Sequence, residues 1–533
     1  MKKNFFLSIL SGLLLGISWP TYGITFFIFF SIVPLLMVLK NIGLKKSKFN
    51  WFKVLSLSFL TFLIWNLITT WWIINSSFFG FIFAVLVNSF LYSLLILIYF
   101  EAKKFLPKFG SFILFVSLWI SFEKFHTIWD FSWPWLNLGN IFSEKTSWIQ
   151  WYEYTGSFGG TLWVLVINIF IYLLIDSKIK SRKIILFKIL RIFIIFISPI
   201  ILSFFISINQ KKKNKSRNFI LFQPNIDPYE EKYNLTNMDN LKLIERMTNG
   251  NLEESTHYIL TPETFFSEEN GEDIDQISSS ILTDSINKFI NKNDSLNILS
   301  GIQLYKFIYN KDSINNNSIR LNNNVWVNFY NSAILYNSNK DYQIYHKSKF
   351  VPGVEILPYK WFFEPLIGNF MLNLGGTVAG RTPQENRSLF VSNLGDKFAA
   401  IICYESIYGS FVTEYIRKGA DFLAIITNDA WWGNTAGHRQ LLSYSRLRAI
   451  ENRRSIVRSA NTGISAIINK KGELIDKLPY NHKGSLRGYF STAKEITFYT
   501  QYGDYIARIS FLIMILFFLL ALSGRLKPNS SKK

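Results

Sequence analysis

The chain has 533 residues, of which 49% are hydrophobic and 17% aromatic, and its mean hydropathy of +0.18 is high for a soluble protein. This composition excludes an ordinary soluble protein and predicts a membrane body with one globular insert. The formal net charge is +21, but the basic residues lie in short stretches between apolar runs, which argues against a nucleic-acid partner.

Eight apolar runs are expected to cross a membrane as helices, since each is near the length of about 20 residues that the hydrocarbon core requires. Seven of them lie in the first two hundred residues with little polar chain between them, so buried core helices do not explain them. The fifth and sixth runs are short. The expected spans lie near Phe5–Trp19, Ile24–Leu39, Val54–Ile74, Phe81–Phe100, Phe112–Phe122, Thr161–Leu174, Ile184–Ile206 and Ile506–Leu522.

Lysine and arginine gather in every second loop between these spans. By the positive-inside rule the basic loops and both termini are expected in the cytoplasm, and the stretch between spans seven and eight outside. The basic stretch Lys211–Arg217 follows span seven on the outer side, but long translocated domains are largely exempt from the rule. We therefore predict three regions: seven membrane helices in 1–207, an extracytoplasmic domain in 208–505, and a final helix with a basic tail in 506–533.

The predicted outer domain alternates short β-rich runs with helix-like stretches, which is typical of a layered α/β or α+β domain. A hairpin-like end is expected at 455–469, with Lys470–Gly472 in its turn. The β-rich runs lie at 218–223, 258–261, 297–301, 325–336, 398–403 and 422–427, and the helix-like stretches at 238–248 and 437–453.

The single cysteine, Cys403, stands where an apolar strand-like run gives way to polar chain. A lone cysteine is most often a small buried hydrophobe. Glu263 and Lys347 also follow strand-like runs, however, and a thiol, a carboxylate and an ammonium at three strand ends would supply a nucleophile, a base and an oxyanion partner. Taken alone, Glu263 reads as a helix-start carboxylate, and Lys347 as a surface lysine like Lys349.

No metal or other cofactor is expected. The five histidines show no paired ligand spacing, and one cysteine cannot build a thiolate site. The tryptophans at span ends, Trp71, Trp72, Trp133 and Trp135, fit an aromatic belt at the membrane interface.

Several motifs occur in the order that marks a known family. The insert resembles the nitrilase superfamily, and the spans and insert together resemble the apolipoprotein N-acyltransferases, its membrane-bound branch. The motifs are Trp133-Pro-Trp-Leu-Asn-Leu-Gly, Thr261-Pro-Glu, Lys347 eight residues before Glu355, Cys403-Tyr404-Glu405, Thr427-Asn-Asp-Ala-Trp-Trp-Gly, and Arg446–Arg453 with Asn461-Thr-Gly. The departures are Gln223-Pro-Asn, Tyr233 in place of a common Trp, and Val351-Pro-Gly-Val-Glu.

The resemblance implies an α-β-β-α sandwich with a Glu–Lys–Cys triad: Glu263 as base, Lys347 as oxyanion partner and Cys403 as nucleophile. Glu355, Tyr404 and Glu405 are expected to support the triad, although a surface salt bridge is an equally good reading of the two glutamates. The residues expected to bind substrate are Trp135, Tyr233, Asn428, Trp431 and Trp432.

The same resemblance implies a function. The expected reaction moves an acyl chain from a phospholipid, through a thioester on Cys403, to the N-terminal diacylglyceryl-cysteine of an apolipoprotein. The expected protein is a monomer in the bacterial inner membrane, with its catalytic domain in the periplasm. A membrane-anchored amidase with the same triad stays open as an alternative. A transporter or non-catalytic sensor is disfavoured, because the spans hold few ionisable groups.

Overall fold

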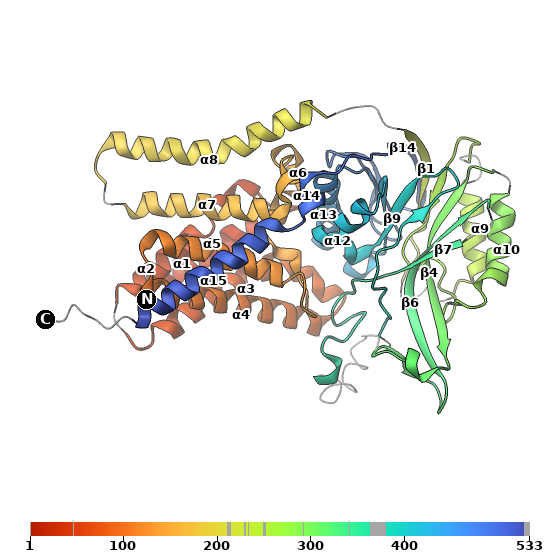
Figure 1. Cartoon of the computed structure of the whole chain (residues 1–533), viewed down its shortest axis with the longest axis horizontal. Helices are drawn as coiled ribbons and strands as arrows, with labels where there is room; N and C mark the ends of the chain where they lie inside the picture. Colours follow the sequence, from red (N-terminus) through yellow and green to blue (C-terminus); the bar gives the residue numbers. More distant parts are fainter. Residues whose placement is uncertain are drawn as a thin grey trace. The chain divides into compact units, whose positions relative to one another are not determined.

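The computed structural model describes residues 2–45, 47–177, 179–210, 215–228, 231–232, 234–248, 252–291, 293–339, 342–362 and 380–526. The chain divides into two compact units (Figure 1). The helical unit comprises Met1–Ile74, Phe78–Gln210 and Tyr502–Lys533, and the sheet unit comprises Asn75–Ser77 and Lys211–Gln501.

The helical unit is built from long apolar helices joined by short loops and 3₁₀ turns (Figure 1). Its α-helices are α1 (Lys2–Ile17), α2 (Val33–Gly43), α3 (Asn50–Thr70), α4 (Phe78–Ala102), α5 (Lys108–Phe125), α6 (Tyr152–Thr155), α7 (Ser157–Asp176), α8 (Arg182–Ile208) and α15 (Tyr505–Leu526). The 3₁₀ segments are η1 (Thr25–Phe29), η2 (Trp71–Asn75), η3 (Lys103–Phe105), η4 (Pro134–Leu136), η5 (Leu138–Glu144) and η6 (Thr146–Trp148).

Within the described residues, six helical segments are long and apolar enough to cross a membrane: Thr25–Gly43, Asn50–Asn75, Phe78–Phe105, Ser157–Asp176, Arg182–Ile208 and Tyr505–Leu526. The first and fifth expected spans are also helical, as α1 and α5, but α1 has only 16 residues. The count of eight spans therefore stays a prediction. Only 6% of the apolar window of α8 is buried, so its apolar side chains are available to lipid.

The larger sheet of the sheet unit has the strand order β14-β1-β2-β4-β6-β5, with β3 paired to β4 and β7 to β6. Strands β1, β2 and β4 run parallel, whereas β14, β6 and β7 pair antiparallel with their neighbours. The bounds are β1 (Ser216–Gln223), β2 (Tyr258–Leu260), β3 (Glu272–Asp273), β4 (Asn297–Ile308), β5 (Ile319–Arg320), β6 (Trp326–Asn337), β7 (Tyr342–His346) and β14 (Gly484–Ser491).

The smaller sheet has the order β13-β12-β11-β10-β9-β8, and its central strands β9, β10 and β11 are parallel. Strand β10 is wholly buried, as its continuous apolar sequence predicts. The bounds are β8 (Phe390–Val391), β9 (Lys397–Ile402), β10 (Phe422–Thr427), β11 (Ile456–Ala460), β12 (Ser465–Ile468) and β13 (Leu474–Leu478).

The two sheets pack face to face and helices cover their outer faces (Figure 1). Helices α9 (Asn237–Thr248) and α10 (Ile281–Ile290) bury apolar side chains against the larger sheet. Helices α12 (Gly409–Arg417) and α13 (Ala436–Asn452) lie on the smaller sheet. The short helix α14 (Phe498–Tyr502) follows β14 in the chain. Between the sheets, the ring of Phe422 lies 5.4 Å from Tyr258 and 4.4 Å from Phe490. This α-β-β-α sandwich confirms the predicted fold class.

The predicted turn of the C-terminal hairpin is wrong. Strands β11 and β12 are antiparallel, as expected, but the turn that joins them is 461–464. Lys470–Gly472 instead joins β12 to β13, which the sequence did not reveal. Strand β13 is partly exposed along its length and has the polar sequence Leu-Ile-Asp-Lys-Leu, so it lacks the apolar signal of a buried strand.

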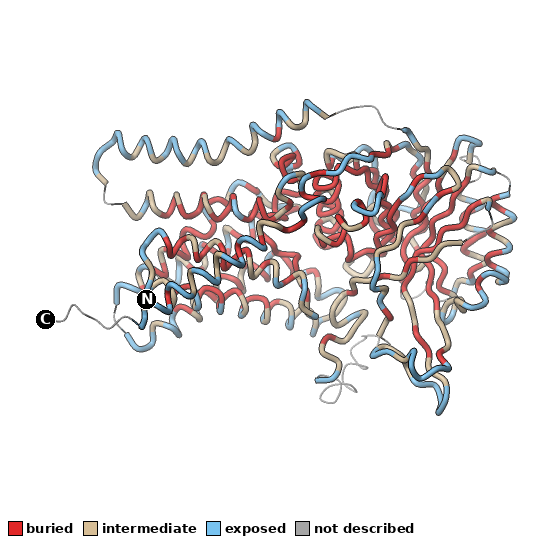
Figure 2. Tube along the Cα trace, in the orientation of Figure 1, coloured by how far each residue is buried: buried red, intermediate tan, exposed pale blue. Residues whose placement is uncertain are grey.

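In the sheet unit, the strands that meet between the two layers are largely buried (Figure 2). Parallel strands deliver their carboxyl ends to one edge of a sheet, where polar side chains can gather next to a rigid core. The ends of β2, β7 and β9 carry the three residues of the predicted triad.

Candidate active site

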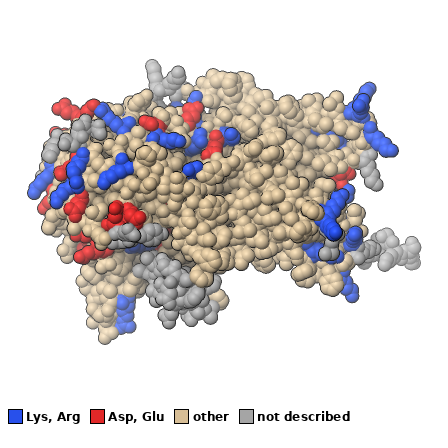
Figure 3. Space-filling view, turned by 180° about the vertical axis from the view of Figure 1, so that it is seen from behind, with Lys and Arg blue, Asp and Glu red and all other residues tan. Residues whose placement is uncertain are grey.

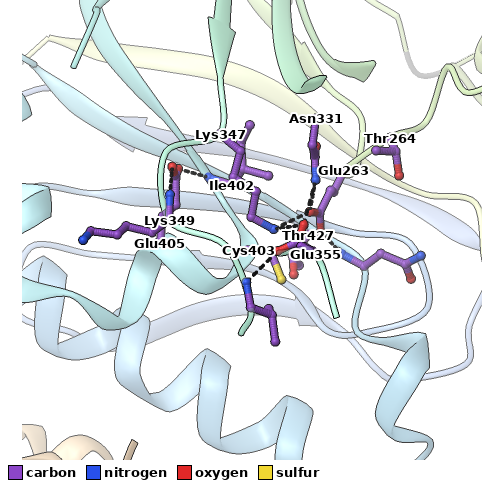
Figure 4. A network of polar contacts seen from close by, with 12 residues as sticks. Glu263, Thr264, Asn331, Lys347, Lys349, Glu355, Ile402, Cys403, Glu405 and Thr427 are labelled. Carbon is purple, nitrogen blue, oxygen red and sulfur yellow. Dashed lines mark hydrogen bonds and ion pairs between the residues drawn. The ribbon is translucent and has the colours of Figure 1, made fainter. Parts of the chain in front are cut away.

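Glu263, Lys347 and Cys403 lie together in the sheet unit (Figure 4). Glu263 follows β2, Lys347 follows β7 directly, and Cys403 follows β9 directly. All three are buried, with 6%, 1% and 6% of their surfaces exposed. The structure thus brings together the residues that the sequence places at three strand ends.

The ammonium group of Lys347 is the centre of this cluster. Its Nζ lies 2.9 Å from Oε1 of Glu263 and 2.8 Å from Oε1 of Glu355. The Nδ2 of Asn331, on β6, donates to the same two carboxylates, at 2.7 Å to Glu263 and 3.3 Å to Glu355. One lysine and one amide therefore hold two carboxylates in fixed positions.

Burial and charge within the cluster together set the protonation states of its three side chains. Burial raises the pKa of Glu263, but the charge and hydrogen bonds of Lys347 outweigh burial and lower it, so the carboxylate is ionised. Burial lowers the pKa of Lys347, but Glu263 and Glu355 hold it well above its usual range. Burial and the charge of Glu263 raise the pKa of the Cys403 thiol, and Lys347 opposes this only in part. A protonated thiol thus faces an ionised carboxylate and a protonated lysine.

The backbone at Cys403 adopts a conformation that a cysteine rarely takes. Its φ of +51° lies in the left-handed region, which costs of order 1–3 kcal/mol for a residue with a side chain. Two contacts hold the turn: the Ser406 hydroxyl donates to the Cys403 carbonyl at 2.8 Å, and the Ile402 N–H donates to Oε2 of Glu405 at 2.8 Å. The sharp turn after β9 orients the sulfur toward Glu263 and Lys347 (Figure 4).

The segment that carries Glu263 crosses β4 at Gly301. A Cβ on Gly301 would lie 2.3 Å from the carbonyl oxygen of Pro262 and 2.7 Å from the Cα of Glu263. Only glycine permits the backbone of Glu263 to lie this close to β4, and this approach fixes how near the Glu263 carboxylate lies to the sheet. The next residue, Thr264, has a φ of +45°, so the chain turns sharply here as well.

Glu405 connects the nucleophile turn to the lysine loop. Its Oε1 accepts from the hydroxyl of Tyr345 and the N–H of Ser348, both at 2.6 Å, while Oε2 accepts from Ile402. Burial raises the pKa of Glu405 to about 6, and these hydrogen bonds oppose the rise. Because every partner is a donor, the ionised carboxylate fits the site best.

We expect Glu405→Gln to destabilise the protein by about 1–3 kcal/mol, because the new NH₂ group must face a buried N–H or O–H donor. Thermal unfolding of the purified protein measures this. The matched control is Glu414→Gln, on a carboxylate 36% exposed that pairs with Lys418 at 3.6 Å; its effect should stay within about 0.5 kcal/mol. Equal unfolding midpoints for both variants would contradict a structural role for Glu405.

Glu355 reaches Lys347 despite the unusual Pro-Gly-Val-Glu sequence before it. The N–H of Val351 donates to Oε2 of Glu355 at 2.8 Å, and the N–H of Glu355 donates back to the Val351 carbonyl at 3.0 Å. Gly353 takes a φ of +79° within this turn. The departure from the family motif therefore leaves the lysine partner in place.

Among the residues expected to bind substrate, Asn428 is at the site: its backbone N–H donates to Oε2 of Glu263 at 3.1 Å. Trp431 and Trp432 lie on η10 (Ala430–Trp432), just beyond it, and are partly exposed. Tyr404 is buried beside Cys403, with its ring 5.5 Å from Tyr408. Tyr233 lies outside the described residues.

Trp135 belongs to the helical unit and is fully buried there, stacked on Trp133 at 5.4 Å and 5.0 Å from Trp72. Trp72 is also buried, so an aromatic-belt role is wrong for these two, whose rings pack inside the protein. The loop that carries Trp135 is fixed by Glu123, which accepts from the N–H of Leu138 at 2.8 Å.

Three features that hold the site in place were not predicted from the sequence. Asn331 bridges the carboxylates. Lys232 donates to the Thr264 hydroxyl, and burial lowers its pKa to about 8 while Glu263 opposes this. A fully buried ion pair joins Asp429 to Arg458 at 2.8 Å and holds the loop after β10. Arg458 and Asn331 could have been found from the sequence, because charged and amide side chains are uncommon inside strand-like runs.

Comparison with known proteins agrees with this geometry. Residues 221–490, half of the chain, match the family model described as carbon-nitrogen hydrolase. The chain belongs to the carbon-nitrogen hydrolase family. Residues 11–170 match a second model, the apolipoprotein N-acyltransferase N-terminal domain. The resemblance inferred from the sequence motifs is thereby confirmed, and the apolar helices make this carbon-nitrogen hydrolase a membrane protein.

Relatives of this carbon-nitrogen hydrolase match it over nearly its whole length. The apolipoprotein N-acyltransferase of Chlorobaculum tepidum is 28% identical over 96% of this chain and 95% of its own. That of Thermotoga maritima is 24% identical over 96% and 92%. Among solved structures, Nit3 of Saccharomyces cerevisiae, from branch 10 of the nitrilase superfamily, is 15% identical over 53% of this chain and 93% of its own, with a TM-score of 0.37.

Proposed function

We propose that this protein is an apolipoprotein N-acyltransferase: it moves one acyl chain from a phospholipid to the N-terminal diacylglyceryl-cysteine of a lipoprotein. The observation that carries the proposal is the union, in one chain, of an N-acyltransferase membrane domain with a carbon-nitrogen hydrolase domain whose Glu, Lys and Cys meet in one buried cluster. The full-length relatives support the same reaction.

In the first half-reaction, Sγ of Cys403 attacks the carbonyl carbon of a phospholipid ester, and the thiol proton passes to Glu263. Lys347 stabilises the oxyanion, with the backbone N–H of Tyr404 as the expected second donor. The C–O bond then breaks, Glu263 returns the proton to the departing lysophospholipid oxygen, and the acyl chain remains on Cys403 as a thioester. Ionised Glu263 and protonated Lys347 suit these roles.

In the second half-reaction, the α-amino group of the lipoprotein cysteine attacks the thioester carbon. Glu263 accepts a proton from the amine, the C–S bond breaks, and the Cys403 sulfur regains that proton. The products are an amide and the original enzyme, so the cycle is ping-pong. Glu355 and Asn331 hold Lys347 throughout, while Glu405 holds the nucleophile turn.

The lipid nature of both substrates bears on the substrate-contact residues and on the location of the protein. Both donor and acceptor are lipids with a polar end, so the site must be reached from the bilayer. We assign Asn428, Trp431, Trp432 and Tyr233 to substrate contacts, and the fully buried Trp135 to ordering the loop that carries it. We place the protein in the inner membrane of a bacterium, as a monomer whose catalytic domain faces the periplasm.

The chemical state of lipoprotein N-termini tests this function in cells. Depleting the protein should leave lipoproteins with a diacylglyceryl-cysteine whose amine is free, and mass spectrometry of N-terminal peptides reads this directly. Restoring the intact gene should return the N-acyl group, and the Cys403→Ala gene should not. Full N-acylation in depleted cells would contradict the proposal.

The proposed sidedness predicts the results of reporter fusions. Fusions after Lys48, Lys183 and Lys533 should report from the cytoplasm, because these positions follow basic loops or the basic tail. A fusion near Asn317, in the segment that joins β4 to β5, should report from outside. Paired phosphatase and fluorescent reporters at each position make the measurement. A cytoplasmic signal near Asn317 would overturn both the topology and a periplasmic acceptor.

A further inference from the structure

The helical unit contains a basic pocket that takes no part in the proposed reaction. Its volume is about 750 Å³, which is ample for a lipid head group. Four lysines line it: Lys45 and Lys48 from the loop between α2 and α3, and Lys103 and Lys104 from η3 after α4. Asn50 and Phe100 also line the pocket.

Local contacts fix the shape of this pocket. The Nδ2 of Asn50 donates to the carbonyl of Lys45 at 2.5 Å and to that of Ile42 at 3.2 Å, which folds the α2–α3 loop back on itself. On the other wall, the ammonium groups of Lys103 and Lys104 lie 4.9 and 5.0 Å from the centre of the Phe100 ring. Cation–π contacts of this kind hold lysine side chains in place.

Positive charge in the pocket exceeds negative charge. Glu101 pairs with Lys104 at 2.5 Å, and within the described residues no ion pair joins Lys45, Lys48 or Lys103 to a carboxylate. Four clustered ammonium groups repel one another and attract an anion. Figure 3 shows the same bias on a larger scale, since Lys and Arg gather at one end of the helical unit and its broad side shows few charges.

We propose that this pocket binds the phosphodiester head group of an anionic phospholipid. The pocket lies at the ends of apolar helices α2, α3 and α4, at the level where head groups meet membrane spans. Basic pockets between membrane helices on the cytoplasmic side are suited to such head groups. The lipid is a ligand of the inner leaflet by the proposed sidedness, so it is distinct from an acyl donor that reaches the periplasmic domain.

Full-length protein in zwitterionic phosphatidylcholine nanodiscs provides the test. Titration with phosphatidylglycerol, followed by native mass spectrometry, should show a saturable bound lipid. Replacing Lys45, Lys48, Lys103 and Lys104 by Gln should weaken this binding by at least about tenfold. The matched control replaces Lys3, Arg182, Lys183 and Arg525, which lie on the same predicted side outside the pocket, and should retain most of the affinity.

Each other outcome is decisive. Equal losses in both quadruple variants would show non-specific attraction and overturn the site. Saturation of the pocket by inorganic phosphate or glycerol phosphate at similar concentrations would assign it to a soluble anion. If the pocket variant does not fold, the unmodified protein can be cross-linked with photoactivatable phosphatidylglycerol. Labels should then map to peptides around 43–50 and 99–105, and labels only elsewhere would contradict the proposal.

Discussion

Cys403→Ala is expected to abolish both the acyl-enzyme and the N-acylated product, with a loss of at least about 10³-fold in turnover. The sulfur is the proposed attacking atom, and among the described side chains of the cluster none offers a second thiol, since Cys403 is the single cysteine of the sequence. The substitution removes one buried atom, so the fold and the Glu263–Lys347 ion pair should persist.

Intact-protein mass spectrometry measures this prediction. Purified protein given phospholipid but no acceptor should gain the mass of one acyl group, on Cys403, which neutral hydroxylamine releases as expected of a thioester. Cys403→Ala should carry none. Cys403→Ser is the informative control: its oxyester should form slowly and transfer poorly to an amine. Full product formation by Cys403→Ala would eliminate the covalent mechanism.

Lys347→Ala is expected to lower turnover by on the order of 10²–10³-fold, whereas Lys349→Ala should be tolerated. Lys347 contacts both Glu263 and Glu355 and is 1% exposed, so its loss removes the proposed oxyanion partner and leaves the two carboxylates without this cation. Lys349 points away from the cluster, and its ammonium lies 5.5 Å from the centre of the Tyr408 ring (Figure 4).

Initial rates of N-acylation, measured beside thermal unfolding, separate catalysis from folding. Breaking a buried ion pair typically costs about 3–5 kcal/mol, so Lys347→Ala should also lower the unfolding midpoint. Lys347→Arg keeps the charge and should recover stability more fully than activity. Equal activity losses in Lys347→Ala and Lys349→Ala, or a loss only in Lys349→Ala, would contradict the assignment of Lys347 as the catalytic lysine.

Local sequence signals predicted the parts of the site that stand at strand ends. The run before Cys403 is continuous and apolar because β9 is buried, and a polar residue can follow such a strand only at its edge. The same reasoning located Glu263 after β2 and Lys347 after β7. The choice of Lys347 over Lys349 came from the family resemblance, through the eight-residue offset to Glu355, and the Val351–Glu355 turn is the physical reason for that offset.

Contacts between distant strands could not be predicted in this way. Asn331 meets Glu263 across 68 residues of sequence, and no local pattern records that β6, separated from β2 by β4, brings Asn331 to the Glu263 carboxylate. The hairpin turn was misplaced because Asn461-Thr-Gly and Lys470-Lys-Gly both have turn chemistry. Burial of Trp135 was hidden as well, since a tryptophan near a span end looks the same in sequence whether it faces lipid or packs inside the protein, as Trp135 does against Trp72 and Trp133.

Product analysis in a reconstituted system tests the central claim most directly. Purified protein, phosphatidylethanolamine bearing a labelled acyl chain, and a peptide with an N-terminal diacylglyceryl-cysteine contain everything the proposed reaction needs. We expect equal amounts of lysophospholipid and N-acylated peptide, with little free fatty acid. Release of the label as free fatty acid, with the peptide amine unchanged, would show a hydrolase and contradict the assignment as an acyltransferase.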